Sequence, residues 1–294
     1  MKILVMLAGW AGNDSEDTRL WLNWYREILL TEFSDSEVFL AISCKSDASL
    51  ERNLGDLPNI SRSERVSSEL HVNSDASQYQ LCLRMLLQKD EEYDLVFFMH
   101  TKGISYPFES YQPWRDSVRK TIFSRSSVES VAAGNSRFLI AERGHMIQAR
   151  SSIEHFRGLS LECGFNTPAF HYAAATTLFY VDAISLKTAL AALPLRYLNK
   201  NLLSVGQNRF FFEGHFPSLL TMAGAEPLFI GGSEYQENFN RDVSYDALPK
   251  HNSAIVREQY RRMLDSDGRY VQMPVPYVTG SLENAYQAGV SFEL

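Results

Sequence analysis

Cysteine, excess positive charge and long apolar segments are all scarce in this 294-residue chain. The three cysteines, Cys44, Cys82 and Cys163, are an odd number without paired spacing, which argues against a disulfide framework or a cysteine-based metal site. The formal net charge of −7 argues against a surface that wraps nucleic acid, because such binding relies on neutralising phosphates. No apolar segment approaches the length of a membrane span. We therefore expect a soluble protein, located by default in the cytoplasm.

The N-terminus carries a short apolar segment, residues 3–8, that is too short for a convincing secretory signal. We interpret it as the first strand. With 45% apolar and 21% charged residues, the chain is long enough for one sizeable α/β domain and an extension. We assign residues 1–232 to the domain. Residues 233–294 are polar and are expected to form a C-terminal extension that packs on it.

Apolar and amphipathic segments alternate along the chain, which predicts strands alternating with helices. The expected strands are residues 2–8, 37–43, 70–73, 95–99, 138–141, 176–181 and 226–230. The expected helices are residues 17–33, 76–88, 113–132, 184–193, 210–222 and 255–264. The serine-rich segment 44–68 is expected to be a long connection with little regular structure. The predicted fold class is α/β, with an open, mostly parallel, Rossmann-like sheet and flanking helices.

The most informative segment is residues 93–103, in which an uninterrupted apolar strand ends in His100, Thr101, Lys102 and Gly103. A strand that is apolar throughout is covered on both faces, as in parallel sheets. Ligand crevices in such sheets lie beyond the carboxyl ends of the strands. The strand is thus predicted to deliver a histidine, a hydroxyl and a cation to a binding edge. An exposed lysine in an ordinary loop is the alternative.

Right-handed crossovers place the loops that follow parallel strands on one rim of the sheet. After the first strand, Gly9 and Gly12 would let the backbone approach a ligand closely. The residues expected to bind a ligand at this rim are Ala8, Gly9, Trp10, Asp75, His100, Thr101 and Lys102.

Three blocks carry a resemblance to a known family. Residues 93–103 (YDLVFFMHTKG), followed by 114–116 (WRD), resemble the "HTKG…WR" block of a broad group of bacterial and viral glycosyltransferases related to rhamnan-synthesis and lipopolysaccharide-assembly enzymes. Residues 171–180 (HYAAATTLFY) are similar to that group's "HF-x-G-x-x-F-W" segment. Residues 208–213 resemble its Arg-x-x-x-Glu helix loosely.

The chain departs from the family pattern in the second block, where Ala174 or Ala175 replaces a glycine and Tyr180 replaces a tryptophan. The resemblance implies that residues 1–232 form a glycosyltransferase domain of GT-A type. It also implies a nucleotide-diphosphate sugar as donor and a hydroxyl acceptor, for which we favour a glycan of a surface polysaccharide.

Departure of the nucleotide develops negative charge on a diphosphate, so the site needs fixed positive charge or a metal. The GT-A fold that the resemblance implies usually carries an Asp-x-Asp pair where this chain has His100, Thr101 and Lys102. The missing carboxylates favour direct stabilisation by Lys102 and Arg115, with Thr101 donating its hydroxyl. The alternative keeps a manganese or magnesium ion with His100 as one ligand. His100 as a buried structural histidine is the third interpretation.

Four positive side chains fall on the helix expected after the histidine motif, where they would face a bound diphosphate. They are Arg115, Arg119, Lys120 and Arg125. A solvated helix face is the alternative interpretation, except for Arg115, which lies in the matching block.

Inverting transfer also needs a base that removes the proton of the acceptor hydroxyl. Glu213 is the first candidate because it lies in the third block, with His215 and Asp182 as substitutes. Each has an ordinary structural explanation, which for Asp182 is the N-cap of the following helix. Glu142 has no support from any motif.

Two other functions stay open. The acceptor could be a modified base in DNA, as for some bacteriophage transferases, although the acidic composition counts against it. The sheet could also be a nucleotide- or glycan-binding module without turnover, because fold does not imply function.

Overall fold

A seven-stranded sheet in the order β3-β2-β1-β4-β6-β5-β7 lies at the centre of the computed structural model. The structure describes residues 1–11, 14–43, 47–65, 75–89, 91–142, 177–192, 212, 216–217, 220 and 223–231. The strands are β1 (Ile3–Gly9), β2 (Glu37–Ile42), β3 (Ile60–Arg65), β4 (Leu95–His100), β5 (Phe138–Glu142), β6 (Phe179–Asp182) and β7 (Glu226–Ile230). The helices are α1 (Glu16–Thr31), α2 (Asp47–Leu54), α3 (Asp75–Leu87), the short 3-10 helix η1 (Glu109–Tyr111), α4 (Gln112–Lys120), α5 (Arg125–Ala132) and α7 (Ala183–Ala192).

Most neighbouring strands are parallel. β1 pairs in parallel with β2 and β4, β2 with β3, and β5 with β7, whereas β6 runs antiparallel to both β4 and β5. The predicted α/β class with a mostly parallel sheet and flanking helices is therefore confirmed. Since β6 reverses direction between them, β4 and β5 point the same way, and their C-terminal ends lie on the same rim as that of β1.

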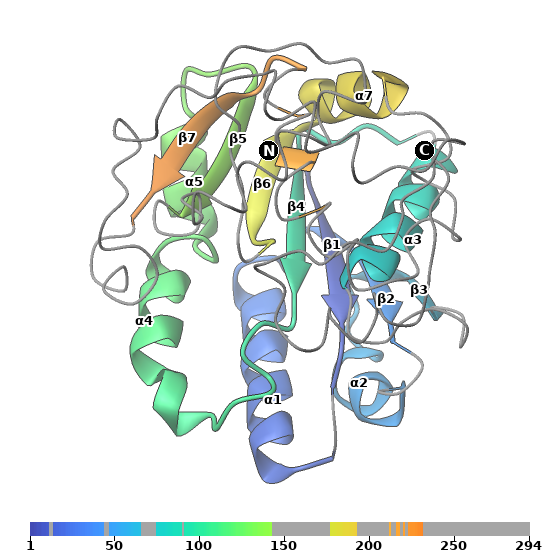
Figure 1. Ribbon diagram of the computed structural model, residues 1–294, viewed down its shortest axis with the longest axis vertical. Helices are drawn as coiled ribbons and strands as arrows, with labels where there is room; N and C mark the ends of the chain where they lie inside the picture. The colour runs from blue at the N-terminus through green and yellow to red at the C-terminus, as the bar shows by residue number, and fades with distance from the viewer. Residues whose placement is uncertain are drawn as a thin grey trace, which may run out of the picture.

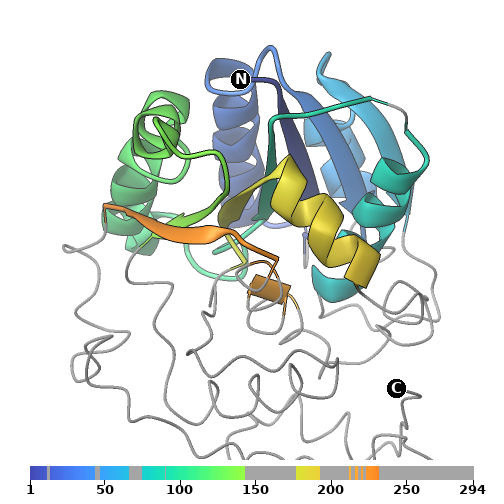
Figure 2. The same ribbon diagram turned by 90° about the horizontal axis from the view of Figure 1, so that it is seen from above.

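Helices cover both faces of the sheet (Figures 1 and 2). Along β1, Ile3, Val5 and Leu7 point into a core shared with α1, α4 and α5, while Leu4 and Met6 point into a second core shared with α3 and α7. This alternation follows from the two-residue period of a strand. Both faces are shielded from water, which explains why β1 and residues 95–99 of β4 are apolar at every position.

The segment 44–68 is more regular than we predicted from its polarity. It contains helix α2 and strand β3, with Leu50 and Leu54 completely buried at helical spacing. β3 lies at the edge of the sheet and is mostly exposed, so its sequence, ISRSER, lacks the apolar signal of a core strand. The prediction of an irregular connection is therefore wrong.

The helix predicted over residues 113–132 is divided into α4 and α5. α4 ends at Lys120, and Thr121 leaves helical geometry with φ −117° and ψ −97°. Ser124 then caps α5 by accepting a hydrogen bond from the Ser127 N–H. The single predicted helix is therefore wrong: the chain forms two helices, and Ser124 caps the start of the second.

Several predicted elements lie outside the described residues: the strand 70–73, the helix 255–264, the extension 233–294 and most of the helix 210–222. In the described part of the chain, no helix has both the length and the apolar character needed to cross a membrane.

Candidate functional site

The C-terminal ends of β1 and β4 lie side by side, with Ala8 opposite His100 (Figure 1). The sheet proceeds outward from β1 through β2 to β3, and β4 then lies on the other side of β1. Open α/β sheets bind ligands at such a switch point, in the crevice beyond the carboxyl ends of the strands. The structure thus brings residues 8–10 together with residues 100–102 where such a crevice is expected.

Thr101 ties these two loops to each other. Its backbone N–H donates to the Ala8 carbonyl at 3.2 Å, and its hydroxyl donates to the Trp10 carbonyl at 2.7 Å. The same hydroxyl oxygen accepts a hydrogen bond of 3.0 Å from the Trp10 N–H. A hydroxyl has one proton, which here is used on Trp10. Thr101 therefore fixes the loop in this conformation and has no proton left for a phosphate.

Gly9 is held from two sides. Its carbonyl accepts hydrogen bonds from the Gln78 side-chain amide at 2.9 Å and from the Ser43 N–H at 3.0 Å. A Cβ at Gly9 would lie 3.1 Å from a methyl carbon of Leu40, so close packing accounts for the glycine. Gln78 lies in the first turn of α3, which brings the start of that helix to the rim. Asp75 begins this helix, but its side chain lies outside the described residues.

Lys102 has a fixed backbone and a partly exposed side chain. Its N–H donates to the His100 carbonyl at 2.8 Å, and its carbonyl accepts a hydrogen bond of 2.7 Å from the Tyr25 hydroxyl. Tyr25 is completely buried in α1 and carries no motif, so the sequence offered no signal for this contact. The next residue, Gly103, has φ +88° and packs against Trp21, where a Cβ would lie 2.6 Å from the indole ring.

His100 is 5% exposed and lies on the face covered by α3 and α7. Its Nδ1 is 3.3 Å from the Thr177 hydroxyl, and the Thr177 carbonyl accepts a hydrogen bond from the Tyr79 hydroxyl at 3.1 Å. Thr177 has φ +49°, an uncommon conformation for a residue other than glycine. The first and second blocks of the family resemblance therefore meet at His100 and Thr177. Thr177 lies in the second block and was missed as a candidate.

Arg115 is buried beside the loop after Lys102. Its guanidinium donates to the Phe108 carbonyl and lies 3.4 Å from the centre of the Phe108 ring. Burial lowers the pKa of Arg115, while Glu109 and Asp116 act in the opposite direction. In this conformation Arg115 secures the loop 103–111, and the predicted contact with a diphosphate stays a prediction.

Two other basic residues of this region, Arg119 and Arg125, pair with acids. Arg119 forms an ion pair of 2.5 Å with Glu27 of α1, and Arg125 pairs with Asp35 and with Glu129, the latter at 3.0 Å. The pairs of Arg119 with Glu27 and of Arg125 with Asp35 join α4 and α5 to the α1 side of the molecule, whereas the pair with Glu129 lies within α5. They fit the interpretation of a solvated helix face better than that of a diphosphate site.

Glu142 ends β5 on the same rim and is 5% exposed. Burial raises the pKa of its carboxyl to about 7, and the hydrogen bond from Thr121 opposes the shift. The Thr121 hydroxyl also lies 3.0 Å from the Ser117 carbonyl, and its one proton cannot serve both oxygens. A protonated Glu142 satisfies both, because it donates to Thr121 while Thr121 donates to Ser117. The sequence did contain a signal for Glu142, because a charged residue directly follows the apolar strand predicted over residues 138–141.

The candidate bases occupy different places. Asp182 lies opposite Leu95, the first residue of β4, and thus at the edge of the sheet away from His100. Its two carboxylate oxygens accept from the N–H groups of Ser185 and Phe138, each at 2.7 Å. Asp182 is therefore an N-cap and a poor base. Glu213 and His215 lie outside the described residues.

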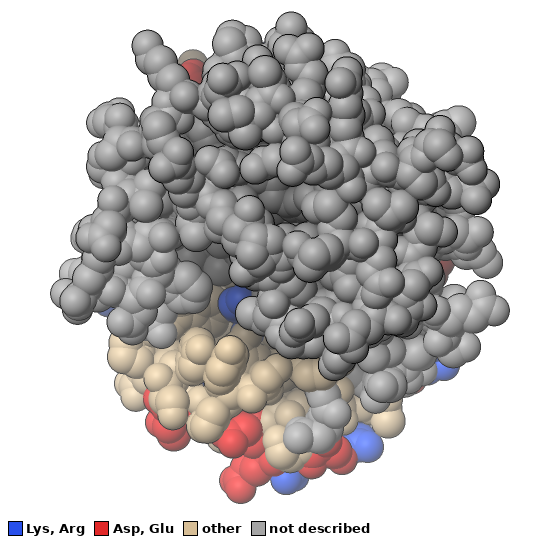
Figure 3. All heavy atoms as spheres, in the orientation of Figure 1, with Lys and Arg blue, Asp and Glu red and all other residues tan. Residues whose placement is uncertain are grey.

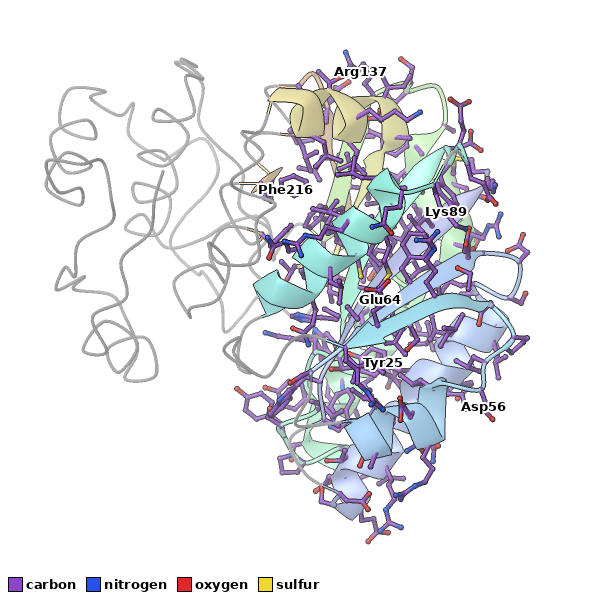
Figure 4. The ribbon with its side chains drawn as sticks, turned by 90° about the vertical axis from the view of Figure 1, so that its right-hand side faces the viewer. Tyr25, Asp56, Glu64, Lys89, Arg137 and Phe216 are labelled. Carbon is purple, nitrogen blue, oxygen red and sulfur yellow. The ribbon has the colours of Figure 1, made fainter. Side chains whose placement is uncertain are left out.

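In Figure 4, Tyr25 of α1 lies in the lower half of the view, and Arg137, which precedes β5, lies at the top. Phe216 extends the core beyond β4, with its ring centre 5.5 Å from that of Phe98.

No group of three or more His, Cys, Asp or Glu side chains in the described part of the chain is arranged to hold a metal ion. Acidic and basic side chains both lie along the lower edge of the face shown in Figure 3. No protein-family model matches the chain, and no curated protein matches it either.

Proposed function

We propose that this protein is a glycosyltransferase that transfers a sugar from a nucleotide-diphosphate sugar to a hydroxyl group, with a surface glycan as the favoured acceptor. One observation carries the proposal. Lys102 lies at the switch point between β1 and β4, with its backbone held on both sides by His100 and Tyr25. A cationic side chain on a backbone that is held at this place suits a diphosphate that gains negative charge.

In the transfer, the bond between the anomeric carbon and the phosphate oxygen breaks, and the acceptor oxygen bonds to that carbon. The electron pair stays on the diphosphate, where the Lys102 ammonium stabilises the added charge. Glu213 stays the predicted base for the proton of the acceptor hydroxyl. Arg115 supports this step by holding the loop after Lys102 in place.

The donor set around the switch point fits a hard divalent ion poorly. Such ions prefer carboxylate and carbonyl oxygens, and the one predicted ligand, His100, is buried with Nδ1 directed at Thr177. We therefore favour charge stabilisation by side-chain cations, with His100 as the predicted ligand if manganese or magnesium takes part.

The GT-A type of the domain and the cytoplasmic location belong to the same proposal. Strands β3, β2, β1 and β4 have the order of the first half of nucleotide-binding α/β sheets, which supports a nucleotide at this rim. A single sheet with β4 parallel to β1 is compatible with one GT-A domain.

The test is titration calorimetry with UDP, GDP and dTDP, followed by an assay of sugar release from the corresponding nucleotide sugars. Binding together with release supports the transferase. Binding without release under any acceptor supplied indicates a nucleotide-binding module. Strongly salt-dependent binding of DNA would favour the phage-type transferase instead. Binding of none of the nucleotides contradicts the proposal.

A further inference from the structure

The loop between β4 and α4 presents a tyrosine whose backbone is fixed. The Tyr106 N–H donates to the Gly103 carbonyl at 2.8 Å, and the Tyr106 carbonyl accepts a hydrogen bond of 2.9 Å from the Trp21 indole. Two residues later, the Phe108 N–H donates to the Asp17 carboxylate at 2.8 Å. Tyr106 is thus held against α1, four residues after Lys102.

The ring of Tyr106 is stacked but exposed. It lies over the Tyr111 ring, with 4.8 Å between the centres and 23° between the planes. Even so, Tyr106 is 50% exposed, and the other large exposed apolar residues of the described chain are all aliphatic. Aromatic rings carry much apolar surface, so a ligand that covers the exposed part of the Tyr106 ring gains free energy by removing that surface from water. Tyr106 and Tyr111 therefore form a preordered, half-open aromatic platform.

Acidic side chains lie near this platform. Glu109 is exposed between the two tyrosines in the sequence, and Asp17 and Glu16 lie in the first turn of α1, which the loop contacts. The cation of Arg115 is buried against Phe108. A neutral ligand with many hydroxyls can donate hydrogen bonds to these carboxylates.

We propose that the Tyr106–Tyr111 platform is a subsite for a neutral sugar ring, which stacks its C–H face on Tyr106. The C–H groups of a pyranose carry partial positive charge and face the negative face of an aromatic ring. As a role for the acceptor glycan, this inference rests on the proposed function. Donor and acceptor then bind at different places. The donor diphosphate binds at Lys102, and the acceptor sugar binds at Tyr106, near Glu109.

The experiment is ligand-observed NMR by saturation transfer, with methyl glycosides of glucose, galactose, mannose and rhamnose as probes. We expect transfer to the ring protons of at least one glycoside in the unchanged protein. Tyr106→Ala should weaken that binding about five- to tenfold, and Tyr106→Phe, which keeps the ring, should preserve it. Ile184→Ala removes an apolar residue that is 59% exposed on α7 and serves as the matched control, with no expected effect.

Absence of transfer from every glycoside, or equal transfer in Tyr106→Ala, overturns the subsite. Uridine and guanosine, which lack phosphate, are tested in the same way. Selective loss of their binding in Tyr106→Ala would show that the platform binds the nucleobase, which also overturns the inference. Calorimetry with UDP and GDP on the same variants separates the two proposals. Glycoside binding that depends on Tyr106, without any nucleotide binding, leaves the subsite standing and removes the transferase.

Discussion

The hydroxyl of Tyr25 donates a 2.7 Å hydrogen bond to the backbone carbonyl of Lys102. The contact joins the buried face of α1 to the turn that presents the candidate cation. Because Tyr25 is completely buried, its hydroxyl cannot exchange this partner for water without opening the core. The position of the Lys102 backbone is therefore set by helix α1, not by its own loop alone.

Replacing Tyr25 by phenylalanine should loosen this turn. The ring stays in the core, so we expect a loss of about 1 kcal/mol in the free energy of unfolding and an affinity for nucleoside diphosphate about three- to tenfold lower. Urea denaturation and calorimetry measure the two quantities. Tyr180→Phe is the matched control, because it removes a buried hydroxyl that donates to the Ile122 carbonyl at 2.8 Å. Equal nucleotide affinity in both variants would show that Tyr25 has only a structural role.

Lys102→Ala should weaken binding of a nucleoside diphosphate by about 1.5–3 kcal/mol, the usual contribution of a hydrogen bond to a charged group. Lys187→Ala makes the same change of net charge on α7, in a lysine whose side chain is 65% exposed. Helix α7 starts where β6 ends, at the opposite edge of the sheet. Calorimetry should therefore show an effect in Lys102→Ala alone, and an unchanged affinity would reject the assignment of the diphosphate to Lys102.

Arg115→Ala should destabilise the fold by about 1–3 kcal/mol, because it removes a buried donor to the Phe108 carbonyl and a ring contact. Arg119→Ala is the comparison. Its ion pair with Glu27 is exposed on both sides, at 37% and 54%, and such pairs contribute about 0–1 kcal/mol. Unfolding in urea measures both. A stable Arg115→Ala variant with low transfer activity would instead favour the predicted contact with the diphosphate.

The sequence predicted the sheet well where a strand is buried on both faces. The apolar segments at residues 3–8 and 95–99 became β1 and β4, and the His100 block lies at the end of its strand as expected. β3 was missed because an edge strand with four of its six residues exposed carries little apolar signal. α2 was missed because its two buried leucines are surrounded by polar residues.

The candidate site was predictable in its location but not in its internal contacts. Strand ends identify residues that share a rim, and Ala8 does lie opposite His100. Which side chain bonds to which group depends on partners far along the chain, such as Tyr25 for Lys102 and Phe108 for Arg115. Such contacts leave no periodic pattern, so the sequence assigned Thr101 and Arg115 to the ligand, whereas in this conformation both bind protein groups.

Sugar transfer should persist in the presence of excess chelator. Under the proposed function, Lys102 takes the place of the two carboxylates that are usual in GT-A glycosyltransferases, and its charge offsets that of the diphosphate directly. An assay of sugar release with and without EDTA measures this. Activity that disappears with EDTA and returns with manganese would contradict the prediction and make His100 the first candidate ligand.

The buried carboxyl of Glu142 should make stability depend on pH. Its pKa is about 7 in the folded protein against an ordinary value of 4.5, so the folded state holds a proton that the unfolded state has lost between these pH values. The free energy of unfolding should therefore fall as the pH rises from 4.5 to about 7, by on the order of 3 kcal/mol, and change little from this group outside that window. Glu142→Gln keeps a side chain that can donate to Thr121 but cannot ionise. Urea denaturation between pH 4.5 and 8 should show a shallower decline in this variant than in the unchanged protein, and parallel curves would show that Glu142 is ionised throughout.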